Sequence, residues 1–284
     1  MLGVIADALS DSVKLLPFLF LTYLAMEYIE HKAGSKMQGM IQKSGRFGPV
    51  FGSFLGAFPQ CGFSTAASNL YAGRIITTGT LMAVFLSTSD EMLPVLISEN
   101  VGLRVIFKIL CVKIIIGMLI GSVIDIALRK WTKTEHEKLQ IEHLCEHEHC
   151  HCEESIIKSA LHHTVEIFLY ILLISCILNG IIAFIGEDFL GSLFLNRPVV
   201  GELIAGLVGL IPNCASSVVL TQLYLEGVLS AGAMMSGLLA GSGIGAAVLL
   251  RVNDRRKENM AVIAALYITG VLSGLLIDVL GIVF

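Results

Sequence analysis

Apolar runs of about 20 residues recur along this chain, and they constrain its fold more than any other feature of the sequence. Clear examples span residues 11–30, 104–128, 164–185 and 259–284. Each run is long enough to cross the ~30 Å hydrocarbon core of a bilayer as a helix. Because no water is available there, such a segment must satisfy its own backbone hydrogen bonds, which forces a helical conformation. The sequence therefore predicts an all-α integral membrane protein.

The composition agrees with this fold class. The chain has 284 residues, of which 55% are hydrophobic and only 15% are charged, and its mean hydropathy is +0.81. Soluble domains average about 25% charged residues. The net charge of −4 gives no indication of a nucleic-acid partner. We expect the lipid bilayer to be the main partner, in a multi-pass protein of the prokaryotic plasma (inner) membrane, and a homodimer is one expected assembly.

An internal repeat divides the chain. Pro59-Gln60-Cys61 and Pro212-Asn213-Cys214 are two versions of one motif, separated by 214 − 61 = 153 residues. The same offset, without a gap, pairs further identical residues: Gly48 with Gly201, Gly56 with Gly209, Tyr71 with Tyr224, Gly79 with Gly232, Gly117 with Gly270, Gly121 with Gly274 and Asp125 with Asp278. This series indicates a duplication. We therefore expect a first membrane repeat (1–129), a polar linker (130–160) and a second membrane repeat (161–284).

Each repeat is expected to contain three full spans and one broken segment. The full spans are 10–31, 77–98 and 103–129 in the first repeat, and 162–185, 230–250 and 259–283 in the second. The broken segments, 45–73 and 198–226, have roughly 12 apolar residues on each side of the Pro-X-Cys motif, too few to cross the core at about 1.5 Å per residue. Each could be a re-entrant hairpin or one interrupted helix.

Loop charges predict that the two repeats have opposite orientations. The loop at 31–46 is basic, whereas its counterpart at 186–198 carries two acids against one arginine. The bias reverses before the last span, where the second repeat has the basic loop (251–257). Because basic loops stay in the cytoplasm, equivalent loops face opposite sides. This inverted topology needs an odd number of crossings per repeat, which favours hairpins, and it places the linker in the cytoplasm and both ends of the chain outside.

Inverted repeats with broken helices are a recurrent plan of secondary transporters, in which substrate sites lie at the breaks. Amide, thiol and hydroxyl groups gather at both motifs. The candidate substrate-binding residues are Gln60, Cys61, Ser64, Thr65 and Asn69 in the first repeat and Asn213, Cys214, Ser216, Ser217 and Gln222 in the second. The alternative for any single small residue is that it only lets helices approach closely.

Charges within the predicted spans form a second set of candidates. Asp90 and Glu91 lie in span 77–98, and Lys113 lies at a similar depth in the next span. Charged side chains at this depth are costly and mark ion or proton pathways. We expect these three residues to serve ion coupling, with a structural ion pair between Lys113 and one acid as the alternative.

The linker is rich in metal ligands: His143, Cys145, His147, His149, Cys150, His151 and Cys152. Thiolates and imidazoles suit zinc or another soft metal, so we expect metal binding here, although no obligatory cofactor. His147 to His151 also matches the H-E-x-x-H pattern of zinc proteases. An intramembrane metalloprotease is therefore a remote alternative from another class, while no enzymatic activity is the expectation.

The paired motifs, the five plus five apolar segments (counting each hairpin as two) and the His-rich central loop resemble the ten-transmembrane heavy-metal exporter family, whose members are labelled arsenic efflux permeases or manganese transporters. The resemblance covers essentially the whole chain and implies export of a metal or metalloid. Paired Cys61 and Cys214 would suit trivalent arsenic, whereas Asp90, Glu91 and amide oxygens would suit Mn²⁺. Helix N-termini at the breaks would instead favour an inorganic or organic anion, which is the alternative transport reading. No nucleotide-binding loop is found in the sequence, so proton-coupled secondary transport is the expected mechanism.

Overall fold

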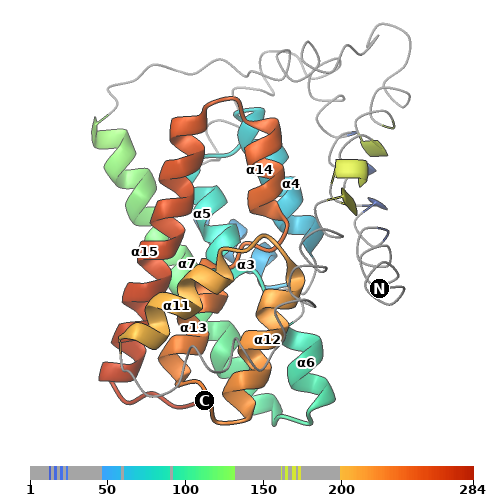
Figure 1. Ribbon diagram of the computed structural model, residues 1–284. Helices are drawn as coiled ribbons and strands as arrows, with labels where there is room; N and C mark the ends of the chain where they lie inside the picture. The colour runs from blue at the N-terminus through green and yellow to red at the C-terminus, as the bar shows by residue number, and fades with distance from the viewer. Residues whose placement is uncertain are drawn as a thin grey trace, which may run out of the picture.

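The computed structural model describes residues 47–58, 61–89, 92–131 and 199–284, together with isolated helical positions between 13 and 24 and between 161 and 173. Within these residues all regular structure is helical and no strand is present. Ten helices form the described part of the molecule (Figure 1). They are α3 (Gly48–Gly56), α4 (Cys61–Ala72), α5 (Thr78–Ser87), α6 (Met92–Ser98), α7 (Leu103–Trp131), α11 (Val200–Gly209), α12 (Cys214–Leu225), α13 (Ala231–Ala240), α14 (Gly245–Val252) and α15 (Arg256–Val279).

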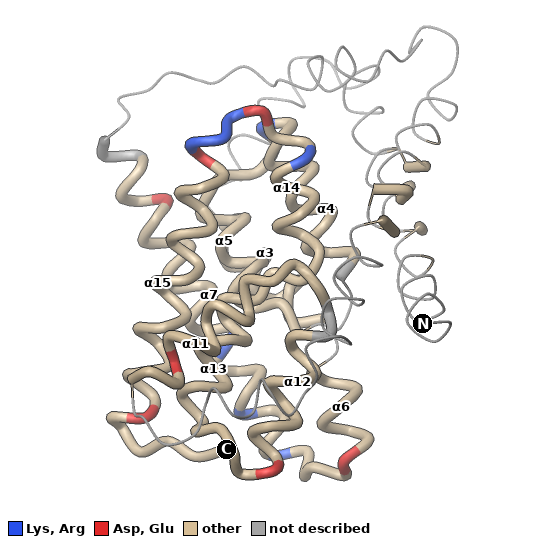
Figure 2. Tube along the Cα trace, viewed as in Figure 1, with Lys and Arg blue, Asp and Glu red and all other residues tan. Residues whose placement is uncertain are grey.

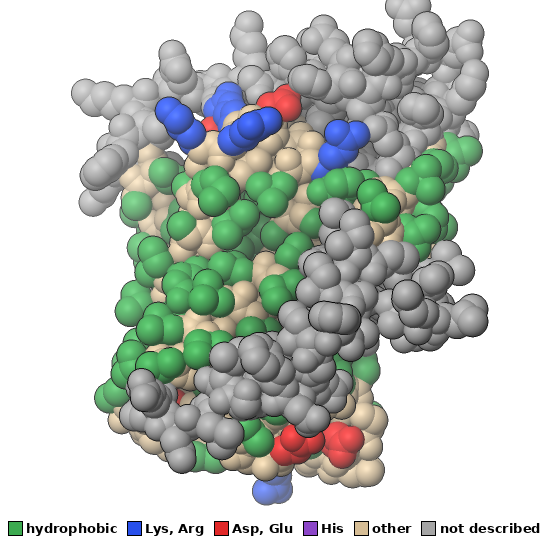
Figure 3. All heavy atoms as spheres, in the orientation of Figure 1, with side chains coloured by type: hydrophobic (Ala, Val, Ile, Leu, Met, Phe, Trp, Pro, Cys, Tyr) green, Lys and Arg blue, Asp and Glu red, His purple; other side chains and the backbone are tan. Residues whose placement is uncertain are grey.

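Four stretches are long and apolar enough to cross a membrane: Thr78–Ser98, Leu103–Leu128, Ala231–Val252 and Arg256–Val279. The first and third are 75% and 89% buried inside the protein, whereas the second and fourth are only 22% and 33% buried. The segments that contain α5 and α6 and α13 and α14 therefore form the core, whereas α7 and α15 present apolar side chains outward. Figure 3 shows apolar side chains over the middle of the molecule, as expected for a surface that faces lipid.

The structure corrects one prediction about these spans. Segments 77–98 and 230–250 were expected to be continuous helices, but each is interrupted. The helix α5 ends at Ser87 and α6 begins at Met92, while α13 ends at Ala240 and α14 begins at Gly245. Each half therefore has two backbone breaks, one at the Pro-X-Cys motif and one in the segment that follows it.

The short helices on either side of each Pro-X-Cys motif form a hairpin. Gly48, at the start of α3, lies against Thr80 in the first turn of α5, and Gly56, at its end, lies against Ser87. The helix α4 then returns, since the hydroxyl of Tyr71 accepts a hydrogen bond from Thr78 Oγ1 (3.4 Å). In the second half α11 packs along α13 in the same way, from Gly201 beside Ala233 to Gly209 beside Gly237.

The two halves use the same contacts at the same offset. Gly79 packs against the backbone of Gly121, and Gly232 packs in the same manner against Gly274. The helices α7 and α15, which the offset relates, run in opposite directions in space. In Figure 1, α7 ends at the same end of the described bundle as the loop that joins α14 to α15, whereas α15 begins at that end and runs to the other.

Asp125 and Asp278 hold these helix pairs together from equivalent positions. Asp125 accepts hydrogen bonds from Thr77 Oγ1 (2.7 Å) and the Gly79 backbone N–H (2.9 Å). Asp278 accepts them from Ser230 Oγ (2.5 Å) and the Gly232 backbone N–H (2.6 Å). Each carboxylate thus satisfies one backbone N–H group at the start of α5 or α13 and interacts favourably with the partial positive charge there.

Replacing either aspartate with alanine should lower the free energy of unfolding by about 1–3 kcal/mol, because a buried backbone N–H loses its acceptor. Thermal unfolding of the purified protein in detergent measures the effect. A variant with Asn at the same position should lose less stability, since the amide oxygen of Asn still accepts a hydrogen bond. An Asp→Ala variant with the stability of the parent would contradict this capping role.

Charged residues gather at the two ends of the described part (Figure 2). One end carries Arg74, between α4 and α5, and the basic junction of α14 and α15, with Arg251, Arg255, Arg256 and Lys257. We call it the basic end. Charged residues at the opposite end belong to the segments after α6 (Glu99) and after α12 (Glu226) and to the first turns of α7 (Arg104 and Lys108). The helix α7 ends at the basic end (Figure 1).

Candidate substrate site

A pocket of about 20 Å³ lies where three backbone breaks meet. The α5–α6 break, the α11–α12 hairpin and the α13–α14 break all contribute to its wall. The lining residues are Thr88, Ser89, Met92, Gly209, Asn213, Ser216, Ser217, Gly237, Leu238, Gly241 and Gly243. This volume holds about one water molecule or a bare ion, so a larger species such as an oxyanion needs the pocket to widen.

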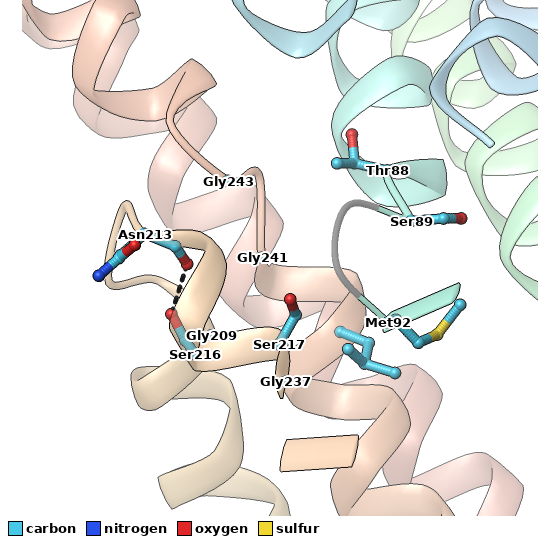
Figure 4. A pocket seen from close by; sticks show the side chains of 11 residues that line it. Thr88, Ser89, Met92, Gly209, Asn213, Ser216, Ser217, Gly237, Gly241 and Gly243 are labelled. Atoms are coloured by element: carbon cyan, nitrogen blue, oxygen red, sulfur yellow. Dashed lines mark hydrogen bonds between the residues drawn. The ribbon is translucent and has the colours of Figure 1, made fainter. Parts of the chain in front are cut away.

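Three predicted substrate-binding residues line this pocket: Asn213, Ser216 and Ser217. Figure 4 shows them on one side, with Thr88, Ser89 and Met92 on the other. Asn213 and Ser216 are both buried, and Ser216 Oγ donates to the Asn213 carbonyl (2.8 Å). This bond ties the hairpin turn to the first turn of α12, which aims the start of that helix at the pocket.

The candidate substrate-binding residues of the first repeat occupy a different environment. Ser64, Thr65 and Asn69 are buried on α4, which packs against α14. A Cβ built on Gly245 would lie 2.8 Å from the Ser64 Cβ, and Ser68 Oγ donates to the Gly245 carbonyl (2.8 Å). For Ser64 this is the close helix approach that the sequence offered as the alternative. Gln222 is half-buried on α12 and does not line the pocket.

Several predicted site residues lie outside what the structure describes. These are Gln60, Asp90 and Glu91, and in the linker His143, Cys145, His147, His149, Cys150, His151 and Cys152, which include the H-E-x-x-H stretch. Cys61 and Cys214 are placed as the first residues of α4 and α12, but their side chains are not described. Among the described residues no cluster of histidine, cysteine and acidic side chains forms a metal site.

Lys113, predicted for ion coupling, reaches the pocket wall from α7. Its side chain is fully buried (0% exposed). The Nζ atom donates to the backbone carbonyl of Thr88 and to that of Leu238 (2.9 Å). Both acceptors are pocket-lining residues at the ends of α5 and α13, so one ammonium group joins the two broken helices.

Helix ends dominate the electrostatics of the pocket. The carbonyl ends of α5 and α13 carry partial negative charge and face Lys113, whereas the N-terminal first turn of α12 supplies partial positive charge beside Asn213, Ser216 and Ser217. Amide and hydroxyl groups at this place can bind either a bare cation through oxygen atoms or an anion through N–H groups. The local geometry is therefore suited to a small charged solute.

Sequence reasoning missed the contribution of the second break to this site. Thr88, Ser89, Gly241 and Gly243 line the pocket, but segments 77–98 and 230–250 were read as uninterrupted spans. A signal was present, because Gly241-Ser242 and Thr88-Ser89 stand at equivalent places and glycine and serine are weak helix formers.

A second cluster, at the basic end, was also missed; we call it the clamp. Arg74 Nη1 forms an ion pair with Glu258 (3.0 Å), and Arg255 Nη1 binds the other oxygen of the same carboxylate (2.9 Å). The Arg74 guanidinium lies 5.3 Å from the Tyr71 ring centroid, and the Tyr71 hydroxyl donates to Glu258 (3.3 Å). The clamp therefore connects the end of α4 in the first half to the start of α15 in the second.

Arg74 adopts a left-handed backbone conformation (φ 59°), as does its repeat counterpart Gly227 (φ 77°). Glycine tolerates this conformation without strain, whereas arginine does not. The presence of arginine therefore reflects what its side chain does. That side chain is only 7% exposed, and its Nε and Nη2 atoms have no hydrogen-bond partner among the described residues.

We expect Arg74→Gly to loosen the basic end without straining the backbone. A cysteine at Ser68, between α4 and α14, should then react with a maleimide about fivefold faster, which corresponds to the loss of an interaction of ~1 kcal/mol. Labelling rates of purified protein, corrected for the native cysteines, measure this. Arg256→Ala, at the exposed first position of α15, is the control. Equal rates in the Arg74→Gly variant and its parent would rule out the clamp.

Comparisons with known proteins agree with this architecture. Residues 1–201 match the model of a family described as "Putative, 10TM heavy-metal exporter". A comparison with curated proteins and one with solved structures found no match. The matched region covers the first hairpin, the first broken helix, α7, the linker and the start of α11. The chain therefore belongs to the ten-transmembrane heavy-metal exporter family.

Proposed function

We propose that this protein is a secondary active transporter that exports a heavy-metal or metalloid ion across the plasma membrane. The observation that carries the proposal is the pocket at which backbone breaks from both halves converge. Unwound backbone within a membrane is tolerated only where it faces protein, water or a ligand. A polar pocket at such breaks is therefore a place where an ion can leave water and be held.

We further propose that the halves are inverted-topology repeats that alternate access to this pocket. The opposite directions of α7 and α15 support this arrangement (Figure 1). So do the equivalent contacts of Asp125 and Asp278 with their helix starts. The basic end would face the cytoplasm, by the preference of basic loops for that side.

Topology can be tested with single cysteines in equivalent loops. Glu99→Cys and Asp254→Cys are both at exposed positions, in loops that the 153-residue offset relates. In sealed cells, a membrane-impermeant maleimide should label the Glu99→Cys protein and spare the Asp254→Cys protein. Labelling of both from outside would overturn the inverted arrangement.

For the substrate we propose an arsenic species or a divalent metal such as manganese. Cys61 and Cys214 stand at equivalent helix starts next to the hairpin turns, where thiolates would favour arsenic. Asp90 and Glu91 directly follow Ser89, a pocket residue, and would bind a coupling proton or a divalent cation. The His/Cys linker would bind zinc or another soft metal in a regulatory role.

An anion is the second candidate substrate, because the first turn of α12 lies at the pocket and helix N-termini bind anions. A transport assay separates the candidates. The full-length protein in proteoliposomes is tested with Mn²⁺, Zn²⁺, arsenite, phosphate and a carboxylate, with and without a proton gradient. A variant in which alanine replaces the seven linker ligands is tested in parallel.

Proton-dependent flux of Mn²⁺ or arsenite that survives the linker changes would support the proposed exporter. Flux of only phosphate or the carboxylate would overturn the exporter proposal and support an anion transporter instead. No flux of any of these solutes, from protein that is folded and correctly inserted, would refute both.

A further inference from the structure

The buried ammonium group of Lys113 contacts two backbone carbonyls that come from different halves of the molecule. Thr88 is the C-cap residue of α5, and Leu238 lies in the last turn of α13. The Nζ atom donates to both carbonyl oxygens, at 2.9 Å in the case of Leu238. One side chain thus reaches the two helix breaks at the pocket from a third helix.

The last carbonyls of a helix lack intrahelical donors and carry partial negative charge. Two such helix ends that converge inside a membrane form a favourable place for a cation. In secondary transporters with broken helices, unwound backbone carbonyls and helix C-terminal ends bind a free coupling cation such as Na⁺. Here the two carbonyls bind a cation that is covalently part of the chain.

The second repeat offers an internal comparison. The residue equivalent to Lys113 is Leu266, which is also fully buried (0% exposed). A repeat can therefore fold with an apolar side chain at this position. A charge within the membrane is expensive, so the ammonium of Lys113 has a role beyond filling space.

The helices α3, α5 and α13 contain no acidic or basic residue. Asp90 and Glu91 follow this point in the chain, and α7 itself carries Lys108 and Asp125 at five or more residues' distance along the helix. The two carbonyls are thus the contacts from α5 and α13 on which the cation site is built.

We propose that Lys113 is a tethered cation, whose ammonium group permanently fills a monovalent-cation site formed by the Thr88 and Leu238 carbonyls. The carrier then needs no free Na⁺ or K⁺ at this position, and the same ammonium fixes the α5–α6 break against the α13–α14 break. This assignment deepens the proposed transport function, because it identifies the cation site beside the pocket and what occupies it.

Chemical rescue tests the proposal. Lys113→Ala removes the ammonium and opens the site, and the purified full-length variant is titrated with methylammonium chloride against choline chloride at constant ionic strength. We expect its Tm to fall below that of the parent and to rise saturably with methylammonium, by about 3–6 °C at about tenfold the Kd. Choline, which is too large for the site, should give no such rise.

Lys113→Leu is the matched control, because it installs the residue of the second repeat and fills the space with apolar atoms. Its Tm should not respond to methylammonium. Equal responses of the Ala variant to methylammonium and choline, or an equal methylammonium response in the Leu variant, would overturn the tethered-cation site.

A second measurement keeps the proposal testable if the alanine variant does not fold. Flux by the parent protein should be the same in sodium, potassium and choline buffers at a fixed proton gradient. A strict requirement for Na⁺ or K⁺ would overturn the proposal. Absence of flux for every tested solute, together with methylammonium rescue of the alanine variant, would instead refute the transport function and leave the cation site standing.

Discussion

Gly209→Ala should lower the free energy of unfolding by about 1–3 kcal/mol, the cost of forcing an extra methyl group into a packed core. A Cβ on Gly209 would lie 2.1 Å from the carbonyl oxygen of Gly237 and 2.8 Å from its carbonyl carbon. These are backbone atoms, which cannot rotate away as a flexible side chain can. The helices α11 and α13 would have to separate, and both residues line the pocket, so substrate binding should fall as well.

Gly201→Ala provides the control on the same helix. Its Cβ would lie 3.6 Å from the Cβ of Ala233, an ordinary contact distance. Since alanine favours helix over glycine, this change should leave stability unchanged or raise it by up to about 1 kcal/mol. Thermal unfolding of the two purified variants measures the contrast. Equal melting temperatures would show that α11 and α13 are not in backbone contact.

The double change Gln60→Ala with Asn213→Ala should reduce flux of the transported ion by about 100-fold or more. Asn213 lines the pocket at the second hairpin, and Gln60 is its equivalent in the first by the 153-residue offset. A hydrogen bond to a charged group contributes about 1.5–3 kcal/mol, and each ~1.4 kcal/mol corresponds to a factor of ten. Loss of two amides from the proposed substrate site therefore has a large expected effect.

This second prediction requires that the variant remain folded. The Asn213 backbone N–H, which donates to the Ile211 carbonyl (2.7 Å), is retained in alanine, so gel filtration should show the parent's profile and Tm should shift little. Glu226→Ala, at an exposed position after α12, controls for expression and reconstitution. Flux at the parent's level in the double variant would remove the Pro-X-Cys turns from the substrate site.

Much of the fold could be predicted from the sequence, because apolar length and proline position are local signals. The apolar runs predicted α7 and α15, and the Pro-X-Cys motifs predicted a short helix on either side of each turn. The breaks after Ser87 and Ala240 were missed because each segment is long and apolar enough overall to read as one span, and the polar and glycine residues at its middle were not taken as a break. Those breaks are stabilised by tertiary contacts, such as Lys113 with Thr88 and Leu238.

The lining of the pocket was predicted in part, because the repeated motif is also a signal that can be read directly from the sequence. Repetition drew attention to Asn213, Ser216 and Ser217, which the structure brings to one pocket. It also drew attention to Ser64, Thr65 and Asn69, which are buried on α4 and do not line it. The clamp residues Arg74 and Glu258 were missed because neither has a charged counterpart in the other repeat, so a search for shared features passes over them.

The lack of symmetry in the clamp has an energetic consequence under the proposed inverted arrangement. Two identical inverted halves would give two conformations of equal free energy, one open to each side of the membrane. Gly227 and Val105 stand where the symmetric clamp would need Arg74 and Glu258, so the described residues close the basic end with an ion pair that the opposite end lacks. Under that arrangement, the clamp would remove the degeneracy and favour the conformation in which the basic end is closed, so the proposed transport cycle would need a step that breaks the clamp.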